Sequence, residues 1–225
     1  MPFGQHITDI LKNAETYHRA YYEAERFGWP SLHFHRRALA TRSPDVTEQH
    51  LEYVYATLAS WGMHRMGKGG SKMQNFDIFC KSIAPLRDRI AQAQEFTLSA
   101  MTDHARNTLR EVFCGIKIMA TGTSLVGNSK AMHHMVPNVV PPVDREYTLK
   151  YLRGSKNIEN DLEAEWTLLQ GIVSDFFAPV AGDRAFAEMA GAWTLQQDRF
   201  PWDTSILKVI DNLVIGSQHA KRSAR

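Results

Sequence analysis

Apolar residues recur at intervals of three and four along most of this chain, and no other feature constrains its fold as tightly. One stripe runs from Ile7 to Phe27, and a longer one runs from Ile158 to Val180. This spacing places apolar side chains along one face of an α-helix. Only residues 137–143 suggest an extended segment, and their three prolines argue against a central strand. The pattern therefore predicts an all-α fold.

Turn signals divide the rest of the chain into separate helices. Shorter apolar stripes bounded by proline, glycine or serine predict further helices at residues 32–40, 45–61, 76–90, 109–119, 183–193 and 204–215. We expect about nine to eleven helices in all. We expect these helices to form one domain over residues 1–216, because a chain of 225 residues can bury a substantial core. This domain could consist of two lobes. The polar, basic end at residues 217–225 is expected to be disordered.

Composition places the chain among ordinary globular proteins. Its residues are 44% hydrophobic and 22% charged, and no apolar run approaches the length of a membrane span. The start, MPFGQHITD, lacks the basic and then apolar layout of a signal peptide. The two cysteines, Cys80 and Cys114, are too few for a disulfide framework or a four-cysteine iron–sulfur cluster. We therefore expect a protein of the reducing cytoplasm, without a membrane partner.

The net charge of +2 conceals an asymmetry between two parts of the chain. Residues 61–130 carry ten Lys and Arg against five Asp and Glu, a balance of +5, whereas residues 151–215 carry five against ten, a balance of −5. Nucleic-acid binding needs a local basic surface rather than a high overall charge. Charge blocks of this size also occur on ordinary helical surfaces, so both interpretations stay open.

The segment from Leu125 to Leu152, LVGNSKAMHHMVPNVVPPVDREYTLKYL, carries most of the functional information. Its first part predicts a hairpin at Leu125–Asn128 between two helices. The backbone N–H groups at the start of the second helix then point outward, and together with the helix dipole they form an anion site. Gly127 allows a phosphate to approach the backbone closely, and Lys130 adds a positive charge. The alternative is an ordinary helix–helix turn with a surface lysine.

The second part of this segment places one carboxylate at a helix start. Pro141-Pro142-Val143 precedes Asp144, and a helical pattern follows it. Asp144 is thus expected at the helix N-cap, where N–H groups keep a carboxylate ionised near neutral pH. Asp144 could be no more than a cap, but capping and catalysis are compatible.

The pairing of LVGNSKA with PPVDREYTLKYL resembles the helix-hairpin-helix DNA glycosylase superfamily. In that family a Leu-Pro-Gly-Val-Gly hairpin, closed by an alanine, precedes a Val-Asp segment that opens a helix. Val126-Gly127 is similar to the Val-Gly of the hairpin, Ala131 to the closing alanine, and Asp144 to the catalytic acid. The resemblance implies a two-lobed helical fold with a helix-hairpin-helix motif within residues 105–152. It also implies double-stranded DNA as the partner.

The same resemblance implies which residues contact DNA and how the bond is cut. The residues expected to hold the DNA backbone are Val126, Gly127, Asn128, Ser129, Lys130 and His133. Members that also cut the strand keep a Schiff-base lysine where this chain has Ser129. Lys130 lies one place later, turned by about 100° on a helix. Lys130 is therefore a secondary catalytic candidate, and hydrolysis by a water is favoured, which makes the enzyme monofunctional.

A glycine-rich loop, Gly62 to Ser71, offers a second set of contacts. Its sequence GMHRMGKG comes close to a nucleotide-binding P-loop, but Gly69 stands where serine or threonine should bind magnesium. A nucleotide cofactor is therefore not expected. Arg65, Lys68 and Lys72 are instead candidates for contacts with the DNA backbone, and the alternative is a solvated loop.

Ten histidines raise the question of a metal site. The pair His33 and His35, like the adjacent His133 and His134, lacks the i, i+4 spacing and the nearby thiolate or carboxylate ligands of a zinc site. We therefore expect neither a metal nor any other cofactor.

These observations predict a monomeric DNA glycosylase that flips a damaged or modified base out of DNA and hydrolyses its N-glycosidic bond, leaving an abasic site. Its role is either base-excision DNA repair or antiviral defence against phages with modified bases. The alternative is a non-catalytic helical DNA-binding module, in which the hairpin clamps a phosphate and Asp144 only caps. A nuclease is disfavoured, because no carboxylate cluster suggests a catalytic metal.

Overall fold

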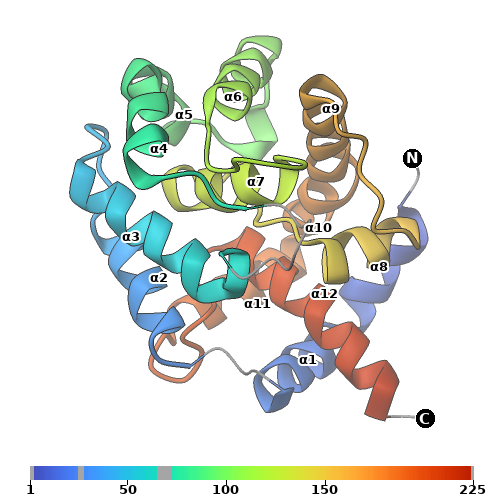
Figure 1. Cartoon of the computed structure of the whole chain (residues 1–225). Coiled ribbons are helices and arrows are strands. Elements are labelled where there is room, and N and C mark those ends of the chain that lie inside the picture. The colour runs from blue at the N-terminus through green and yellow to red at the C-terminus, as the bar shows by residue number, and fades with distance from the viewer. Residues whose placement is uncertain (1–2, 25–27, 65–71, 224–225) are drawn as a thin grey trace. The chain divides into compact units, whose positions relative to one another are not determined.

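The protein is helical throughout the part of the chain that can be described. The computed structural model describes residues 3–24, 28–64 and 72–223. Among these residues no β-strand forms, and the β-type pairing present is an isolated bridge between Met73 and Met119. The prediction of an all-α fold is therefore confirmed (Figure 1). No helix in the described ranges is both long enough and apolar enough to cross a membrane.

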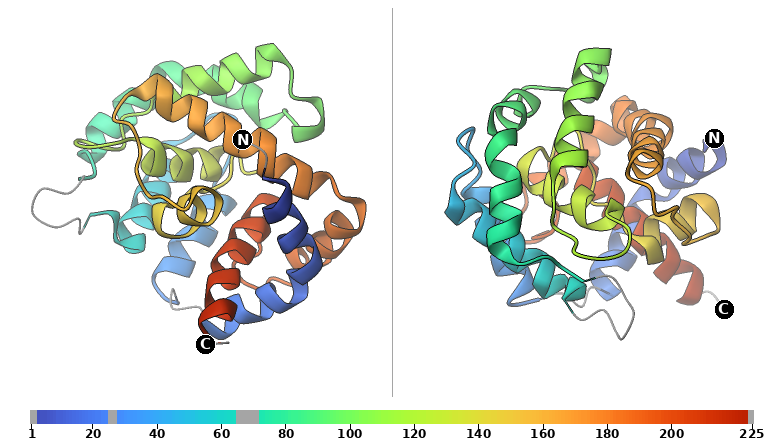
Figure 2. Two further views of the ribbon diagram at one scale, coloured as in Figure 1. Left: turned by 90° about the vertical axis from the view of Figure 1, so that its right-hand side faces the viewer. Right: turned by 45° about the horizontal axis from the view of Figure 1, so that its top comes forward.

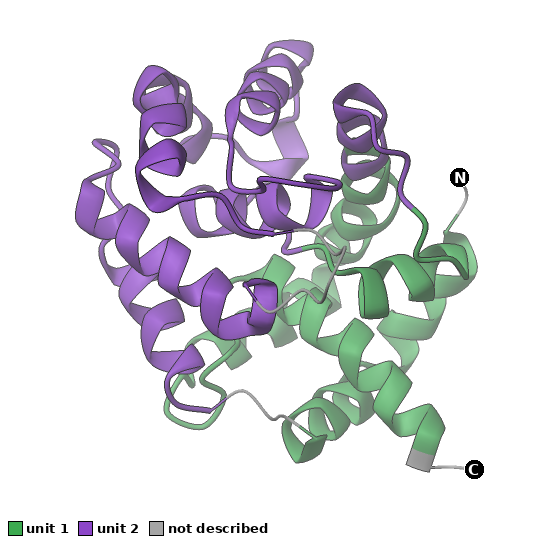
Figure 3. Cartoon of the chain, viewed as in Figure 1, with its two compact units in different colours: residues 1–26, 143–157, 170–225 green, residues 27–142, 158–169 purple. Residues whose placement is uncertain are grey.

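The chain divides into two compact units, which Figure 3 shows in separate colours. Unit 1 comprises Met1–Arg26, Val143–Asn157 and Gln170–Arg225, and unit 2 comprises Phe27–Pro142 and Ile158–Leu169. Each unit therefore combines segments that lie far apart in the sequence. A boundary drawn at a single position along the chain would not separate them.

Unit 1 is built on two long helices, α1 (Gly4–Ala24) and α12 (Ile206–Ser223), which pack side by side (Figure 2, left). Shorter helical segments complete this unit: η4 (Arg145–Leu149), α8 (Lys150–Arg153), η5 (Val173–Phe177), α10 (Ala178–Gly182) and α11 (Arg184–Thr194).

The packing of α1 on α12 follows from the spacing of apolar residues on α1. Ile10, Ala14, Tyr17 and Tyr21 recur at steps of three and four, and all four are buried. On α12, Gly216 faces the backbone of α1, and a Cβ added there would overlap the carbonyl oxygen of Tyr17. Glycine is therefore required at this position by the close approach of the two helix backbones.

The C-terminal segment 217–225, expected to be disordered, is helical through most of its length because α12 continues into it. Two of its polar side chains have partners on other segments of unit 1. Gln218 donates a hydrogen bond to the carbonyl oxygen of Tyr147 at 3.1 Å, and the Lys221 ammonium lies 3.3 Å from a carboxylate oxygen of Asp9. The prediction of disorder was wrong for residues 217–223, because polar side chains in this segment bind groups on α1 and η4.

Unit 2 contains α7 (Leu125–Met135), which packs against α2, α3 and α6. The helical segments of this unit besides α7 are α2 (Ser31–Ala40), α3 (Glu48–Leu58), η1 (Ala59–Met63), α4 (Phe76–Ile83), η2 (Ala84–Leu86), α5 (Arg87–Gln94), η3 (Leu98–Ala100), α6 (Asp103–Gly115) and most of α9 (Leu162–Ile172). Every residue of α7 except Lys130 is buried. This short helix is therefore the core of unit 2.

Candidate functional site

The connection before α7 differs from the predicted hairpin. Residues 125–128, expected to form the turn, are the first turn of α7 itself, which begins directly after Ser124. The chain instead turns earlier, between the end of α6 at Gly115 and Ser124, where Gly122 has a φ of 73°. The placement of the hairpin was wrong, because the sequence pattern identified the glycine at position 127 as the turn residue.

The start of α7 already holds an anion supplied by the chain. The backbone N–H of Leu125 donates a hydrogen bond to the carboxylate of Glu165, which comes from α9 and is only 2% exposed. A carboxylate at a helix N-terminus is stabilised by the helix dipole and by the unpaired N–H groups there. The N-terminus of α7, predicted to bind a DNA phosphate, therefore binds the side chain of Glu165.

Sequence reasoning missed Glu165, although the sequence contains a signal for it. Leu162 lies three residues before Glu165, and Leu169 lies four residues after it, so Glu165 falls within the apolar stripe of α9. A charged residue at a core position of a helix is rarely buried without a partner. The position of Glu165 therefore indicates a buried hydrogen-bond acceptor whose donors come from other segments of the chain.

Gly127 serves packing in this structure. A Cβ at this position would lie 2.7 Å from the side chain of Met119 and 2.9 Å from that of Ile118. Both distances are shorter than carbon atoms tolerate in a close-packed interior. Ile118 and Met119, from the segment before α7, therefore pack against Gly127. They occupy the space that was predicted for a phosphate.

The polar residues that follow Gly127 are turned into unit 2. The Asn128 amide donates to the carbonyl oxygens of Phe113 and Ile116, at 2.8 and 3.3 Å, and ties α7 to the end of α6. The Ser129 hydroxyl donates to the carbonyl oxygen of Val126 at 3.2 Å. Val126, Asn128 and Ser129 are all buried, so in this arrangement no external ligand reaches their side chains.

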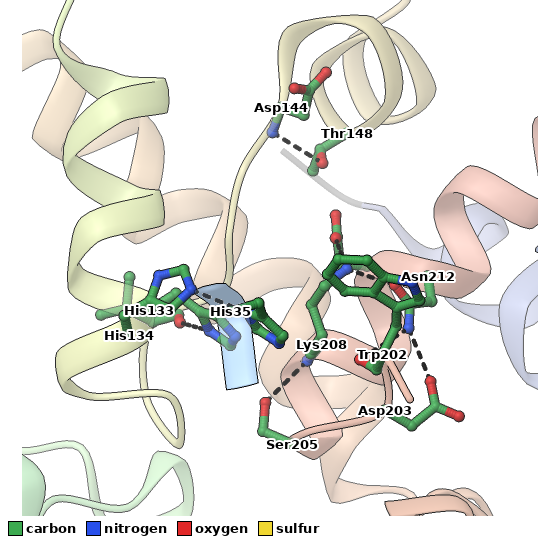
Figure 4. Close-up of polar contacts among 12 residues, drawn as sticks. His35, His133, His134, Asp144, Thr148, Trp202, Asp203, Ser205, Lys208 and Asn212 are labelled. Atoms are coloured by element: carbon green, nitrogen blue, oxygen red, sulfur yellow. Dashed lines mark hydrogen bonds and ion pairs between the residues drawn. The ribbon is translucent and has the colours of Figure 1, made fainter. Parts of the chain in front are cut away.

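His134 links α7 to α2 through a pair of buried imidazoles. Nε2 of His134 lies 3.0 Å from Nδ1 of His35, and both residues are 0% exposed (Figure 4). Nδ1 of His134 lies 2.7 Å from the carbonyl oxygen of Lys130, which can only accept, so that nitrogen carries the proton. Nε2 then accepts from the N–H of His35 when both rings are neutral.

His133 is also interior and is held by the chain itself. Its Nδ1 lies 2.9 Å from the carbonyl oxygen of Val140 and must donate to it. This bond fixes the return of the chain after α7. Within the described residues, no group of three or more His, Cys, Asp or Glu side chains is arranged to hold a metal ion.

Of the remaining predicted DNA contacts, Lys130 and Lys72 have solvent-accessible side chains. Lys130 is partly exposed, and its ammonium lies 5.5 Å from the centre of the Trp61 ring, within cation–π range. Lys72 is exposed just before α4. Arg65 and Lys68 lie outside the described residues.

Asp144 occupies the helix N-cap, as predicted. Its backbone is extended, with φ −129° and ψ 147°, and its Oδ1 accepts from the N–H groups of Glu146 at 2.8 Å and Tyr147 at 3.4 Å. Its own N–H donates to the Thr148 hydroxyl at 3.2 Å (Figure 4). These reciprocal bonds hold the residue at both its backbone and its side chain.

The surroundings of Asp144 combine a rigid approach with access to solvent. Pro141, Pro142 and Val143 are buried before it, and Thr148 is buried after it, whereas Asp144 itself is partly exposed. Amide donors favour the charged form of a carboxylate. The arrangement therefore provides a carboxylate that is fixed by backbone donors and that water can reach.

Unit 1 contains a buried polar network that the sequence analysis did not find. The ammonium of Lys208 on α12 contacts the Asp211 carboxylate at 2.8 Å and the Asn212 side-chain oxygen at 2.5 Å. The Asn212 amide donates to Asp203 at 2.8 Å (Figure 4). The other oxygen of Asp203 lies 2.6 Å from Nε2 of His18 on α1. All five residues are 5% exposed or less.

This network joins α12 to α1, and the Asn212 amide also donates to the carbonyl oxygen of Trp202 at 3.3 Å. Buried charges are tolerated when they are paired in this way. The signal in the sequence was the triplet Lys208, Asp211 and Asn212, which occupies i, i+3 and i+4 within an otherwise apolar helix. We interpret the network as a structural element of unit 1.

Comparison with known proteins gives no further assignment. No family model matches the chain, and no characterised protein or solved structure matches it either.

Proposed function

We propose that the protein is a DNA glycosylase that hydrolyses the N-glycosidic bond of a damaged or modified base and leaves an abasic site. The observation that carries this proposal is Asp144, a partly exposed carboxylate held by two backbone N–H groups at the start of η4. The rigid Pro-Pro-Val approach and the resemblance of residues 141–152 to the Val-Asp segment of helix-hairpin-helix glycosylases support the same assignment.

The chemistry requires one such group. Cleavage of a base–sugar bond builds positive oxocarbenium character on the deoxyribose. A carboxylate close to the sugar stabilises that charge and orients or activates the attacking water. Asp144 is suited to this role because its N–H donors keep it ionised and its cap geometry fixes its position. The base must leave the helical stack to be reached, so the proposal includes base flipping.

The proposal assigns hydrolysis to water and does not use a lysine nucleophile. Ser129 stands where family members that also cut the strand keep a Schiff-base lysine, and Lys130, one place later, has its ammonium 5.5 Å from the centre of the Trp61 ring. The phosphate clamp at the start of α7 is also left out, because Glu165 already takes the N–H of Leu125.

One observation favours a second candidate, a helical DNA-binding module without catalysis. The reciprocal bonds between Asp144 and the segment up to Thr148 are sufficient for a residue that only caps a helix. The substitution Asp144→Asn separates the two candidates, because asparagine caps a helix about as well as aspartate but carries no charge.

The test uses duplex oligonucleotides that carry assorted oxidised, alkylated, deaminated or bulky modified bases. After incubation with the protein, alkali converts abasic sites into strand breaks. We expect breaks with the wild type, and a rate of base release at least about 100-fold lower for Asp144→Asn. Unchanged thermal unfolding would show that the variant is folded. Base release at the wild-type rate by Asp144→Asn, or no release from any substrate, would contradict the proposal.

A further inference from the structure

The segment from Gly28 to Pro44 is the most one-sidedly basic stretch of the described chain outside the predicted site. It carries Arg36, Arg37 and Arg42 and not a single Asp or Glu. All three arginines are exposed. The segment includes α2, so these charges project from a rigid helix and from the turn that follows it.

The two sides of α2 differ in what they present. Ser31, His35 and Ala38 are buried and form the inner side. His33 and Arg37 lie four residues apart on α2, a spacing that places them on the same face, and Trp29 lies in the turn just before the helix. We call Trp29, His33, Arg36 and Arg37 the α2 strip.

An exposed tryptophan begins this strip. Three large apolar side chains are exposed among the described residues, namely Trp29, Ile78 and Leu195. Trp29 is 76% exposed, and its ring lies 4.3 Å from that of His33. At the other end, the Arg37 guanidinium lies 5.1 Å from the centre of the Tyr53 ring and donates to its hydroxyl at 3.2 Å. The strip thus has an exposed indole at one end and two guanidinium groups at the other, the second of which contacts the Tyr53 ring.

We propose that the α2 strip binds an unpaired stretch of DNA, with a base stacked on Trp29 and phosphates at Arg36 and Arg37. Sites for single-stranded nucleic acid combine cationic side chains along the backbone with aromatic rings that stack on bases. From His33 to Arg37 the strip spans about 6 Å, at 1.5 Å per residue of helix, and Trp29 extends it beyond the N-terminal end of α2.

An unpaired strand fits this surface better than a duplex or an acidic peptide. Bases within a duplex are already stacked on one another, so Trp29 would find no base face to cover. A peptide carboxylate satisfies the arginines but offers no flat ring to the indole. The choice of DNA as the nucleic acid rests on the proposed function, because base flipping leaves unpaired bases in a duplex.

The experiment measures binding and does not depend on base release. Fluorescence anisotropy of a labelled single strand of thymidines is recorded against protein concentration at several salt concentrations. Trp29→Ala should weaken binding roughly 5- to 100-fold, the range seen when one stacking ring is removed. Arg37→Gln should lower the slope of log affinity against log salt by about 0.7, the value for one phosphate contact on a single strand.

Matched controls lie on exposed positions of unit 1. Leu195→Ala removes a side chain that is 87% exposed, and Arg184→Gln removes a charge that is 92% exposed. Both should bind the single strand like the wild type, and Trp29→Phe should retain part of the affinity because phenylalanine still stacks. Because Trp29 is exposed, its replacement should leave unfolding unchanged.

Three outcomes would overturn the inference: no binding of the single strand, equal affinity of Trp29→Ala and wild type, or equally tight binding of polyglutamate or of anionic lipid vesicles. Loss of affinity in Trp29→Ala without any base release would uphold the strip and reject the glycosylase. Base release with unchanged affinity in Trp29→Ala would do the reverse.

Discussion

Two helices of this protein, α7 and η4, both begin at a carboxylate, but one carboxylate is buried and the other is accessible to solvent. Each has a carboxylate at its N-terminus, where N–H groups and the helix dipole favour negative charge. Glu165 reaches α7 from 40 residues along the chain and is 2% exposed, whereas Asp144 belongs to the start of η4 and is partly exposed. The same electrostatic preference thus stabilises a core in one place and holds a surface group ready in the other.

The largest effect that tests this comparison is expected for Glu165→Ala. The substitution leaves the buried N–H of Leu125 without its acceptor, and loss of a buried charged partner costs about 3 kcal/mol. Urea unfolding should show a correspondingly lower free energy of unfolding. Glu165→Gln, which keeps an oxygen acceptor but not the charge, should lie between Glu165→Ala and the wild type.

The matched control is Glu163→Ala on the same helix. Glu163 pairs with Arg110 at 2.8 Å, but its side chain is 56% exposed, and exposed ion pairs contribute about 0–1 kcal/mol. If Glu163→Ala and Glu165→Ala lower the free energy of unfolding equally, the start of α7 is not stabilised by a buried carboxylate. The N-terminus of α7 would then remain a candidate phosphate site.

A smaller effect is expected at the other helix start. Asp144→Ala removes an N-cap acceptor and should lower the free energy of unfolding by about 1 kcal/mol. Asp144→Asn and Asp144→Ser should restore most of it, because both side chains still accept from the N–H groups of Glu146 and Tyr147. A loss of about 3 kcal/mol would place Asp144 with Glu165 as a core residue and weaken its case as a reactive group.

The smallest effect concerns a third carboxylate, Asp9, which is held by side chains and not by a helix start. Burial raises its pKa, but hydrogen bonds from Tyr17 at 2.7 Å and Tyr151 at 3.0 Å and the charge of Lys221 outweigh burial, so the pKa of Asp9 is lowered in the folded protein. A lowered folded pKa contributes stability above the unfolded value near 3.9 that is lost as pH falls below it.

We therefore expect the free energy of unfolding to drop between about pH 4 and pH 2, and the drop to shrink in Asp9→Asn. Unfolding curves recorded across this range for both proteins would measure the contribution. Because Asp9 is partly exposed, at 28%, the effect should stay below that of Glu165→Ala. Identical pH profiles for the two proteins would show that Tyr17, Tyr151 and Lys221 do not stabilise the carboxylate.

The burial of α7 could not be predicted from the sequence. Asn128, Ser129, His133 and His134 make its sequence look like one for a surface turn and a half-exposed helix. A helix that is buried on nearly all sides has no polar face, so periodicity does not reveal it. Its polar side chains are tolerated inside because distant groups satisfy them, as the carbonyl of Phe113 does for Asn128.

The sequence by itself determined that the chain is helical and that Asp144 starts a helix. Both depend on residues within about four positions of one another, which apolar spacing and capping chemistry describe. Only the tertiary structure decided that α1 pairs with α12, that Glu165 fills the start of α7, and that Lys208, Asp203 and His18 share one buried network. Such partners are chosen by the packing of segments far apart in the chain, and a buried polar group accepts whichever donor that packing delivers.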